Sequence, residues 1–286
     1  MRLKERLSRL LPTPVKKGLV VRKEKGTLQR TPTVECHPKH LKPIDEVALK
    51  NLLVFPGMET EWENARKHLH SLNIPDMTGG VNPGDRRAIY SLIRRLKPRS
   101  VLEVGTHIGL STLQIALALS ANQMEDGKSA KVVSVDIMDV NDPVAKPWLE
   151  YGMTLSPAEI LEKMKLKQHV EFVKNRSLSF LEKSERQFDF IFLDGDHSAK
   201  TVYKEVPAAL RALENNGVVL LHDYFPNLEP LWSNGVVIPG PFLAMERLKA
   251  EGAKLAVLPL GELPWPTKLQ SNVTSLALLL GNGRQG

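Results

Sequence analysis

The chain has 286 residues, of which 42% are hydrophobic and 25% charged, proportions that are ordinary for a globular protein. Its formal net charge is +7, and its one cysteine, Cys36, excludes an intramolecular disulfide framework and a cysteine-based metal cluster. No apolar run approaches the ~20 residues that cross a bilayer, and no apolar segment typical of a signal peptide follows the basic start, so we expect a cytoplasmic protein.

Positive charge is concentrated in the first thirty residues. The first leucines fall on one face of a predicted short helix, which Pro12 and Pro14 end. The rest of residues 1–45 is expected to be an extended arm. We expect a solvated arm, or one packed on its own domain or on a partner subunit, which makes a homodimer plausible. Contact of residues 1–25 with a membrane surface is a less favoured alternative. Nucleic-acid binding is not expected, because no aromatic side chains for base stacking are interleaved with the charges.

Helical spacing of apolar residues begins at 46–72, is interrupted at Pro56-Gly57, and is followed by a turn-rich segment, 77–84. Asp85 is placed to cap the next helix, 85–96. Beyond it, short apolar runs alternate with helical patterns. The predicted strands are 100–104, 131–136, 169–174, 188–193 and 217–222. The predicted helices between and after them are 110–121, 156–165, 176–184, 199–213 and 241–251.

This alternation predicts an α/β fold with a doubly wound, mostly parallel sheet whose strands are buried on both faces. The last apolar runs, 254–259 and 274–280, have no helix between them and predict an antiparallel pair at the sheet edge. We therefore expect a basic N-terminal arm and helical extension over residues 1–80, and the main domain over 81–286.

The first predicted strand runs into a glycine-rich turn, V-L-E-V-G-T-H-I-G-L-S, over residues 101–111. Gly105 and Gly109 permit a sharp turn, and the following helix start offers unpaired N–H groups to a ligand. A dinucleotide-binding turn, G-x-G-x-x-G, needs a middle glycine where Thr106 and His107 stand here. The turn predicts a cofactor without a pyrophosphate, so a nicotinamide-dependent oxidoreductase is the less favoured enzyme.

Polar side chains follow the other strands, at the carboxyl ends where doubly wound sheets bind ligands. Asp136 ends the second strand and could accept hydrogen bonds from both hydroxyls of a ribose, or be an ordinary surface carboxylate. Ser177 follows the third strand, either as a helix N-cap or as a cofactor contact. The fourth strand ends in D-G-D-H, residues 194–197, and the fifth in H-D, residues 222–223.

Adjacent parallel strands would bring Asp194 and the pair His222-Asp223 into one pocket. Two carboxylates and an imidazole could hold Mg²⁺, Mn²⁺ or another divalent cation, although Mg²⁺ prefers oxygen donors. Alternatively, Asp194 fixes its own loop through backbone amides and His222 is a packed core histidine.

The pattern E-x-G-x-x-x-G at Glu103 resembles motif I of the class I S-adenosylmethionine (SAM)-dependent methyltransferases. D-G-D-H followed by H-D is similar to the small-molecule O-methyltransferase branch, which includes sugar- and antibiotic-tailoring enzymes. The resemblance covers about residues 80–286 and implies a Rossmann-like seven-stranded sheet with an antiparallel edge strand. It also implies SAM-dependent methyl transfer to a hydroxyl of a small molecule. The cofactor-binding residues that it implies are Glu103, Gly105, Thr106, Gly109, Ser111, Asp136, Ile137, Ser177 and Asp194.

The resemblance further implies that His197, with Asp194 beside it, is catalytic and takes the hydroxyl proton as general base. Asp194 and Asp223, with His222 as a third ligand, would bind a metal where one is used. His222 departs from the relatives, which often have Glu, and this weakens the case for Mg²⁺. The long loop 223–240, with its aromatic residues, is expected to cover the substrate. A non-catalytic or RNA-directed protein of the same fold, recruited through the basic arm, is the alternative function.

Overall fold

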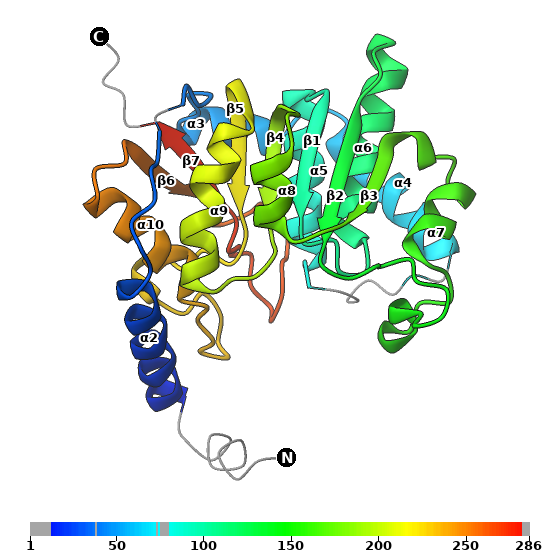
Figure 1. Cartoon of the computed structure of the whole chain (residues 1–286). Helices are drawn as coiled ribbons and strands as arrows, with labels where there is room; N and C mark the ends of the chain where they lie inside the picture. Colours follow the sequence, from blue (N-terminus) through cyan, green and yellow to red (C-terminus); the bar gives the residue numbers. More distant parts are fainter. Residues whose placement is uncertain (1–12, 38, 73, 75–79, 282–286) are drawn as a thin grey trace.

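The structure is a computed structural model and describes residues 13–37, 39–72, 74 and 80–281. The leucine-rich helix predicted before Pro12 lies outside these residues. A central seven-stranded sheet has the order β3-β2-β1-β4-β5-β7-β6 (Figure 1). Its strands are β1 (Ser100–Val104), β2 (Lys131–Asp136), β3 (Val170–Lys174), β4 (Phe188–Leu193), β5 (Leu213–Leu221), β6 (Leu255–Pro259) and β7 (Ala277–Gly281).

The sheet confirms the predicted α/β class and its mostly parallel pairing. Strands β1 to β5 pair in parallel, and β7 pairs antiparallel with both β5 and β6. The predicted antiparallel pair is therefore present, with β6 at the edge and β7 inside it. Side chains alternate between the faces: Phe190 and Phe192 join one buried cluster, and Ile191 and Leu193 join the other. This alternation explains why β4 is apolar from Phe190 to Leu193.

Helices cover both faces of the sheet (Figure 1). On one face, residues of α3, α4, α5 and α6 form a buried cluster with the strands, and on the other face residues of α2, α8, α9 and α10 do so. The helices are α2 (Thr13–Gln29), α3 (Glu46–Leu53), α4 (Met58–Ser71), α5 (Pro83–Leu96), α6 (Leu110–Asp126), α7 (Pro157–Lys163), α8 (Ser177–Lys183), α9 (Ala199–Arg211) and α10 (Gly240–Ala250). Three short 3₁₀ helices are η1 (Pro147–Tyr151), η2 (Lys167–His169) and η3 (Pro226–Leu228).

Helix α2 stands where the sequence predicted an extended arm, and that prediction was wrong. Pro14 lies in its first turn, where a proline leaves no helical hydrogen bond unmade. Tertiary contacts hold the other end: Leu28 is buried, and the Glu24 carboxylate accepts a hydrogen bond from the backbone N–H of Ala199 at 2.8 Å. The helix therefore depends on packing against α9 more than on its own periodicity.

Two predicted helix caps are placed differently. The N-cap of α5 is Asn82, whose side chain accepts a hydrogen bond from the Asp85 N–H at 3.1 Å, and the Asp85 side chain turns into the protein. The N-cap of α8 is Arg176, which makes no side-chain cap, and Ser177 is the first helical residue. Both Asp85 and Ser177 are thus free to bond elsewhere.

The segment before residue 80 is packed into the same core as the sheet. Ile44 and Trp62 belong to the buried cluster that contains Phe190, and Leu41 forms an isolated β-bridge with Gly217. The boundary at residue 80 stays a prediction from the sequence. Among the described residues, no helix is long and apolar enough to cross a membrane.

Candidate active site

The glycine-rich turn after β1 lies directly against the end of β4. Gly105 and Gly109 have φ of 94° and 77°, in the left-handed region that favours glycine. A Cβ atom on Gly105 would lie 2.1 Å from the carbonyl oxygen of Asp194, which no side chain permits. The Asp194 N–H in turn donates to the Val104 carbonyl at 2.9 Å. The first glycine therefore allows the turn and the D-G-D-H segment to meet.

Glu103, the acidic residue of the turn, is wholly buried. Its Oε2 accepts hydrogen bonds from the hydroxyls of Thr112 and Ser134, the latter at 2.6 Å. Its Oε1 accepts none from the part of the chain that the structure describes. Burial raises the pKa of Glu103 to about 7, although the surrounding hydroxyls oppose this. Glu103 thus orders the turn and leaves one oxygen unpaired, as a ligand contact would require.

Asp136 is held at the end of β2 by two backbone amides. The N–H groups of His107 and Met138 donate to its two carboxylate oxygens at 2.8 and 2.9 Å. The carboxylate borders a cavity of about 120 Å³ that Thr106 also lines. Ile137, the next residue, is 56% exposed beside it. The orientation of the Asp136 carboxylate, the predicted ribose contact, is therefore fixed by backbone amides. The carboxylate borders a cavity and is followed by the exposed side chain of Ile137.

Ser177 bonds to a residue that the sequence analysis missed. Its hydroxyl donates to Oε1 of Glu205 in α9, a side chain only 2% exposed. Burial raises the pKa of Glu205 to about 7, and Asp196 adds to the effect while the Ser177 hydrogen bond opposes it. Glu205 lies three residues after Val202 on the apolar face of a predicted helix, and this placement was the available signal.

The ends of β4 and β5 bring four of the predicted residues together. Nδ1 of His222 lies 2.7 Å from Oδ1 of Asp194. Nε2 of His197 lies 3.5 Å from the same oxygen and 3.4 Å from Oδ2 of Asp223. His197 is thus placed between two carboxylates, and its side chain remains 27% exposed.

His222 is enclosed by carboxylates on both sides of its ring. Its Nε2 lies 3.3 Å from Oδ2 of Asp85, which reaches it from α5. Burial alone would lower the pKa of His222, but the charges of Asp194 and Asp223 outweigh this and raise it well above its ordinary value. For Asp85 the sequence predicted only a capping role, and nothing in its spacing signalled this contact.

The remaining acidic groups of the two motifs differ in their tasks. Burial would raise the pKa of Asp223, but the nearby His222 and His197 bring it below its ordinary value. Asp196 instead accepts hydrogen bonds from the Ser198 N–H and the Thr201 hydroxyl at the start of α9. The first Asp of D-G-D-H therefore faces the cluster, and the second fixes the helix that follows.

Three of these side chains have the spacing of a cation site. Asp194, His197 and His222 each offer a ligand atom, and the three atoms lie within 4.8 Å of one another. Nδ1 of His222 is buried and makes no well-aligned hydrogen bond to any described residue, despite its short distance to Asp194. An orphaned nitrogen beside a carboxylate fits a divalent cation, and mixed nitrogen and oxygen donors favour a transition metal over Mg²⁺.

The loop after β5 is packed around its own aromatic residues. Phe225 and Trp232 are buried and pack edge to face with centroids 5.6 Å apart. The indole N–H of Trp232 donates to the Val273 carbonyl at 3.2 Å, which ties this loop to the connector between β6 and β7. Phe225 and Trp232 thus form the interior of the 223–240 loop, and the connector between β6 and β7 packs against that loop, which the sequence did not indicate.

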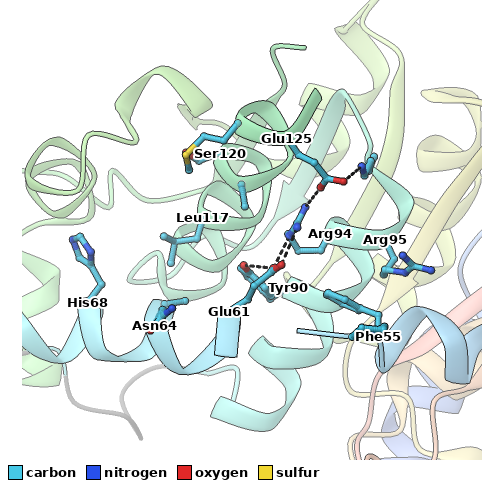
Figure 2. Close-up of a pocket in the computed structure, with 15 residues that line it drawn as sticks. Phe55, Glu61, Asn64, His68, Tyr90, Arg94, Arg95, Leu117, Ser120 and Glu125 are labelled. Carbon is cyan, nitrogen blue, oxygen red and sulfur yellow. Dashed lines mark hydrogen bonds and ion pairs between the residues drawn. The ribbon is translucent and has the colours of Figure 1, made fainter. Parts of the chain in front are cut away.

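A larger cavity, of about 840 Å³, lies away from this chemistry, between α4, α5 and α6 (Figure 2). Arg94 crosses it and pairs with Glu61 at 2.7 Å and with Glu125 at 3.1 Å. Glu125 also pairs with Lys97 at 2.8 Å. These charged side chains thus pair with one another, and the cavity lies apart from the residues that meet at the strand ends.

Comparison with known proteins places the strand-end motifs in one family. Residues 102–224 match the family described as "Methyltransferase domain", and this span runs from β1 to just beyond β5. Caffeoyl-CoA O-methyltransferase of Zinnia elegans is 27% identical over 231 residues, which are 73% of this chain and 80% of that one. The chain therefore contains a methyltransferase domain and is similar to SAM-dependent O-methyltransferases.

Solved structures of methyltransferases share its fold. The O-methyltransferase of Bacillus cereus in complex with SAH superimposes with a TM-score of 0.52 at 18% identity, covering 83% of this chain and 96% of that one. TomG of Streptomyces achromogenes, an O-methyltransferase in complex with SAM, gives 0.51 at 19% identity, with the same coverage. Within this methyltransferase, the predicted site residues all lie in the matched span, whereas Asp85 precedes it.

Proposed function

We propose that this methyltransferase transfers the methyl group of SAM to a hydroxyl of a small molecule. The observation that supports this most is the position of His197 between Asp194 and Asp223, beside the glycine-rich turn. The named activities of similar proteins, caffeoyl-CoA and other O-methyltransferases, point the same way. They also argue against the RNA-directed and nicotinamide-dependent alternatives. A homodimer stays a prediction, which light scattering of the purified chain would measure.

SAM, which supplies a methyl group on a sulfonium, fits the residues around the turn. The unpaired Oε1 of Glu103 and the backbone of Gly105 face the polar end of the ligand in this proposal. Asp136 receives the ribose hydroxyls, and the exposed Ile137 covers one side of the adenine. Ser177, oriented by its bond to buried Glu205, lies on the adenine side as well.

His197 is the group that moves a proton in this proposal. A hydroxyl that attacks a methyl group must lose its proton, and an imidazole near neutral pH is suited to accept it. The carboxylates of Asp194 and Asp223, at 3.5 and 3.4 Å from Nε2, stabilise the imidazolium that results. Holding the acceptor in line with the methyl group supplies a further part of the rate.

A divalent cation would be held here by Asp194 and His222, with Asp223 close by. His197, the third member of the group with cation-site spacing, would then stay unliganded as the base. When bound, such a cation lowers the pKa of an acceptor hydroxyl and orients it. The nitrogen of His222 leads us to expect a softer ion than Mg²⁺.

Turnover with a panel of hydroxylated small molecules tests the proposal, with SAH release and the mass of the product as readouts. We expect His197→Asn to lower kcat by about 100-fold or more while SAM affinity is retained. His68→Asn, in an exposed residue of α4, is the matched control and should leave kcat unchanged. A His197 variant with full turnover, or methyl transfer to nitrogen or carbon alone, would contradict the proposal.

A further inference from the structure

The carboxylate of Asp85 is buried, and the N-cap of α5 does not account for its burial. Asp85 is the third residue of α5 and is 0% exposed, although aspartate is seldom fully buried. The N-cap bond of α5 uses only its backbone N–H, which donates to Asn82. Any residue except proline would supply that N–H, so the cap bond itself does not require a carboxylate at this position.

Two donors meet on one oxygen of this carboxylate. Oδ2 of Asp85 receives the side-chain amide of Asn82 at 2.7 Å and faces Nε2 of His222 at 3.3 Å. Oδ1 is buried and has no hydrogen-bond partner among the described residues. A buried carboxylate that leaves one oxygen unsatisfied is costly, which indicates that its contact with His222 is retained for the site.

The consequence for His222 follows from the two nitrogens of its ring. When Nε2 carries a proton and donates it to Asp85, the ring cannot rotate freely and Nδ1 faces Asp194. Histidines that bind metals commonly donate their other N–H to a carboxylate, which fixes the tautomer and makes the ligating nitrogen more basic. Asp85 stands in that relation to Nδ1.

We propose that Asp85 is a positioning residue that fixes the orientation and tautomer of His222, so that Nδ1 points into the active site as a cation ligand. The cation-binding part of this inference rests on the proposed function, whereas the part about the orientation of the His222 ring does not. Asp85 itself touches neither substrate nor cation. It acts from a helix outside the segment that carries the methyltransferase motifs.

The test compares Asp85→Ala, which removes the acceptor, with Asp85→Asn, which keeps an oxygen for the His222 N–H. Histidine-selective ¹⁵N NMR reports which nitrogen of His222 bears a proton, with the signal assigned by its loss in His222→Gln. With Zn²⁺ present to occupy Nδ1, we expect the wild-type ring to carry its proton on Nε2, a changed protonation pattern in Asp85→Ala, and recovery in Asp85→Asn. Asp45→Ala, which removes the N-cap of α3, controls for a lost helix cap and should lower Tm without the same change at His222.

Titration with Mn²⁺ or Zn²⁺ supplies the second readout. We expect Asp85→Ala to weaken cation binding by about 10–100-fold, with SAM affinity within about 2-fold of the wild type. Wild type that binds neither ion would overturn the cation part of the proposed function, while the NMR result still tests Asp85. The inference is overturned if Asp85→Ala folds and retains the wild-type His222 pattern, or if Asp45→Ala produces the same change.

Discussion

At the scale of single residues, buried carboxylates carry most of the information. Glu103, Asp85 and Glu205 are each at most 2% exposed. Glu103 was predictable, because it stands at a fixed place before the glycine turn. Asp85 and Glu205 were not assigned, because a charged residue in a helical pattern shows neither its depth nor its partner until the helix is packed.

Glu205 should make the stability of the protein depend on pH. Its pKa in the folded state is about 7, above the ordinary value of 4.5. The folded state therefore holds the proton more tightly, so this stabilisation is complete below about pH 4.5 and is lost as pH rises towards 7. The full effect on the free energy of unfolding is about 3 kcal/mol at most.

Glu205→Gln should remove that dependence, because glutamine can still accept the Ser177 hydrogen bond without carrying a charge. We expect the Tm of the variant, relative to wild type, to be higher at pH 8 than at pH 5. Glu214→Gln, in an exposed residue, should show no such pH-dependent difference. Equal differences at the two pH values would show that Glu205 does not titrate in this window.

At the scale of elements, the start of α9 is where three helices meet around the D-G-D-H segment. Glu24 of α2 accepts the Ala199 N–H, and Gly240 of α10 lies against the carbonyl of His197. The strands were predictable to within a few residues at nearly every end, since each is a short apolar run. Helix α2 was not, because its stability comes from contacts with α9 and α10 that sequence spacing does not show.

Gly240→Ala should disturb the position of His197. A Cβ atom there would lie 1.8 Å from the His197 carbonyl oxygen, so the segment has to shift. We expect a loss of about 1–3 kcal/mol in the free energy of unfolding, together with a lower kcat. Gly18→Ala, where nothing lies within 4 Å of the added atom, is the control and should not lower either value. An unchanged kcat in Gly240→Ala would show that the His197 segment tolerates the shift.

Glu24→Ala tests the contact between α2 and α9. Removing the carboxylate leaves the Ala199 N–H without its acceptor, and we expect a loss of about 1 kcal/mol in denaturant unfolding. The neighbouring exposed Lys23 provides the control substitution, Lys23→Ala. Equal stability of the two variants would mean that the bond contributes nothing measurable.

At the scale of the whole molecule, the residues of the proposed active site lie together at the carboxyl ends of the parallel strands. The turn, Asp136, the D-G-D-H segment and His222-Asp223 all lie at the carboxyl ends of parallel strands, which is why the site could be anticipated from the sequence. The shape of the 223–240 loop could not be predicted from the sequence, because it depends on how this loop packs against the connector between β6 and β7.

Calorimetric titration of the intact chain with SAM tests the central claim most directly. We predict saturable binding at one site per chain, weakened about 10-fold or more in Asp136→Asn, because the ribose hydroxyls lose a charged acceptor. Glu150→Gln, an exposed charge change nearby in sequence, should bind SAM as the wild type does. Folded wild-type protein that does not bind SAM, or an Asp136 variant that binds it equally well, would contradict the account.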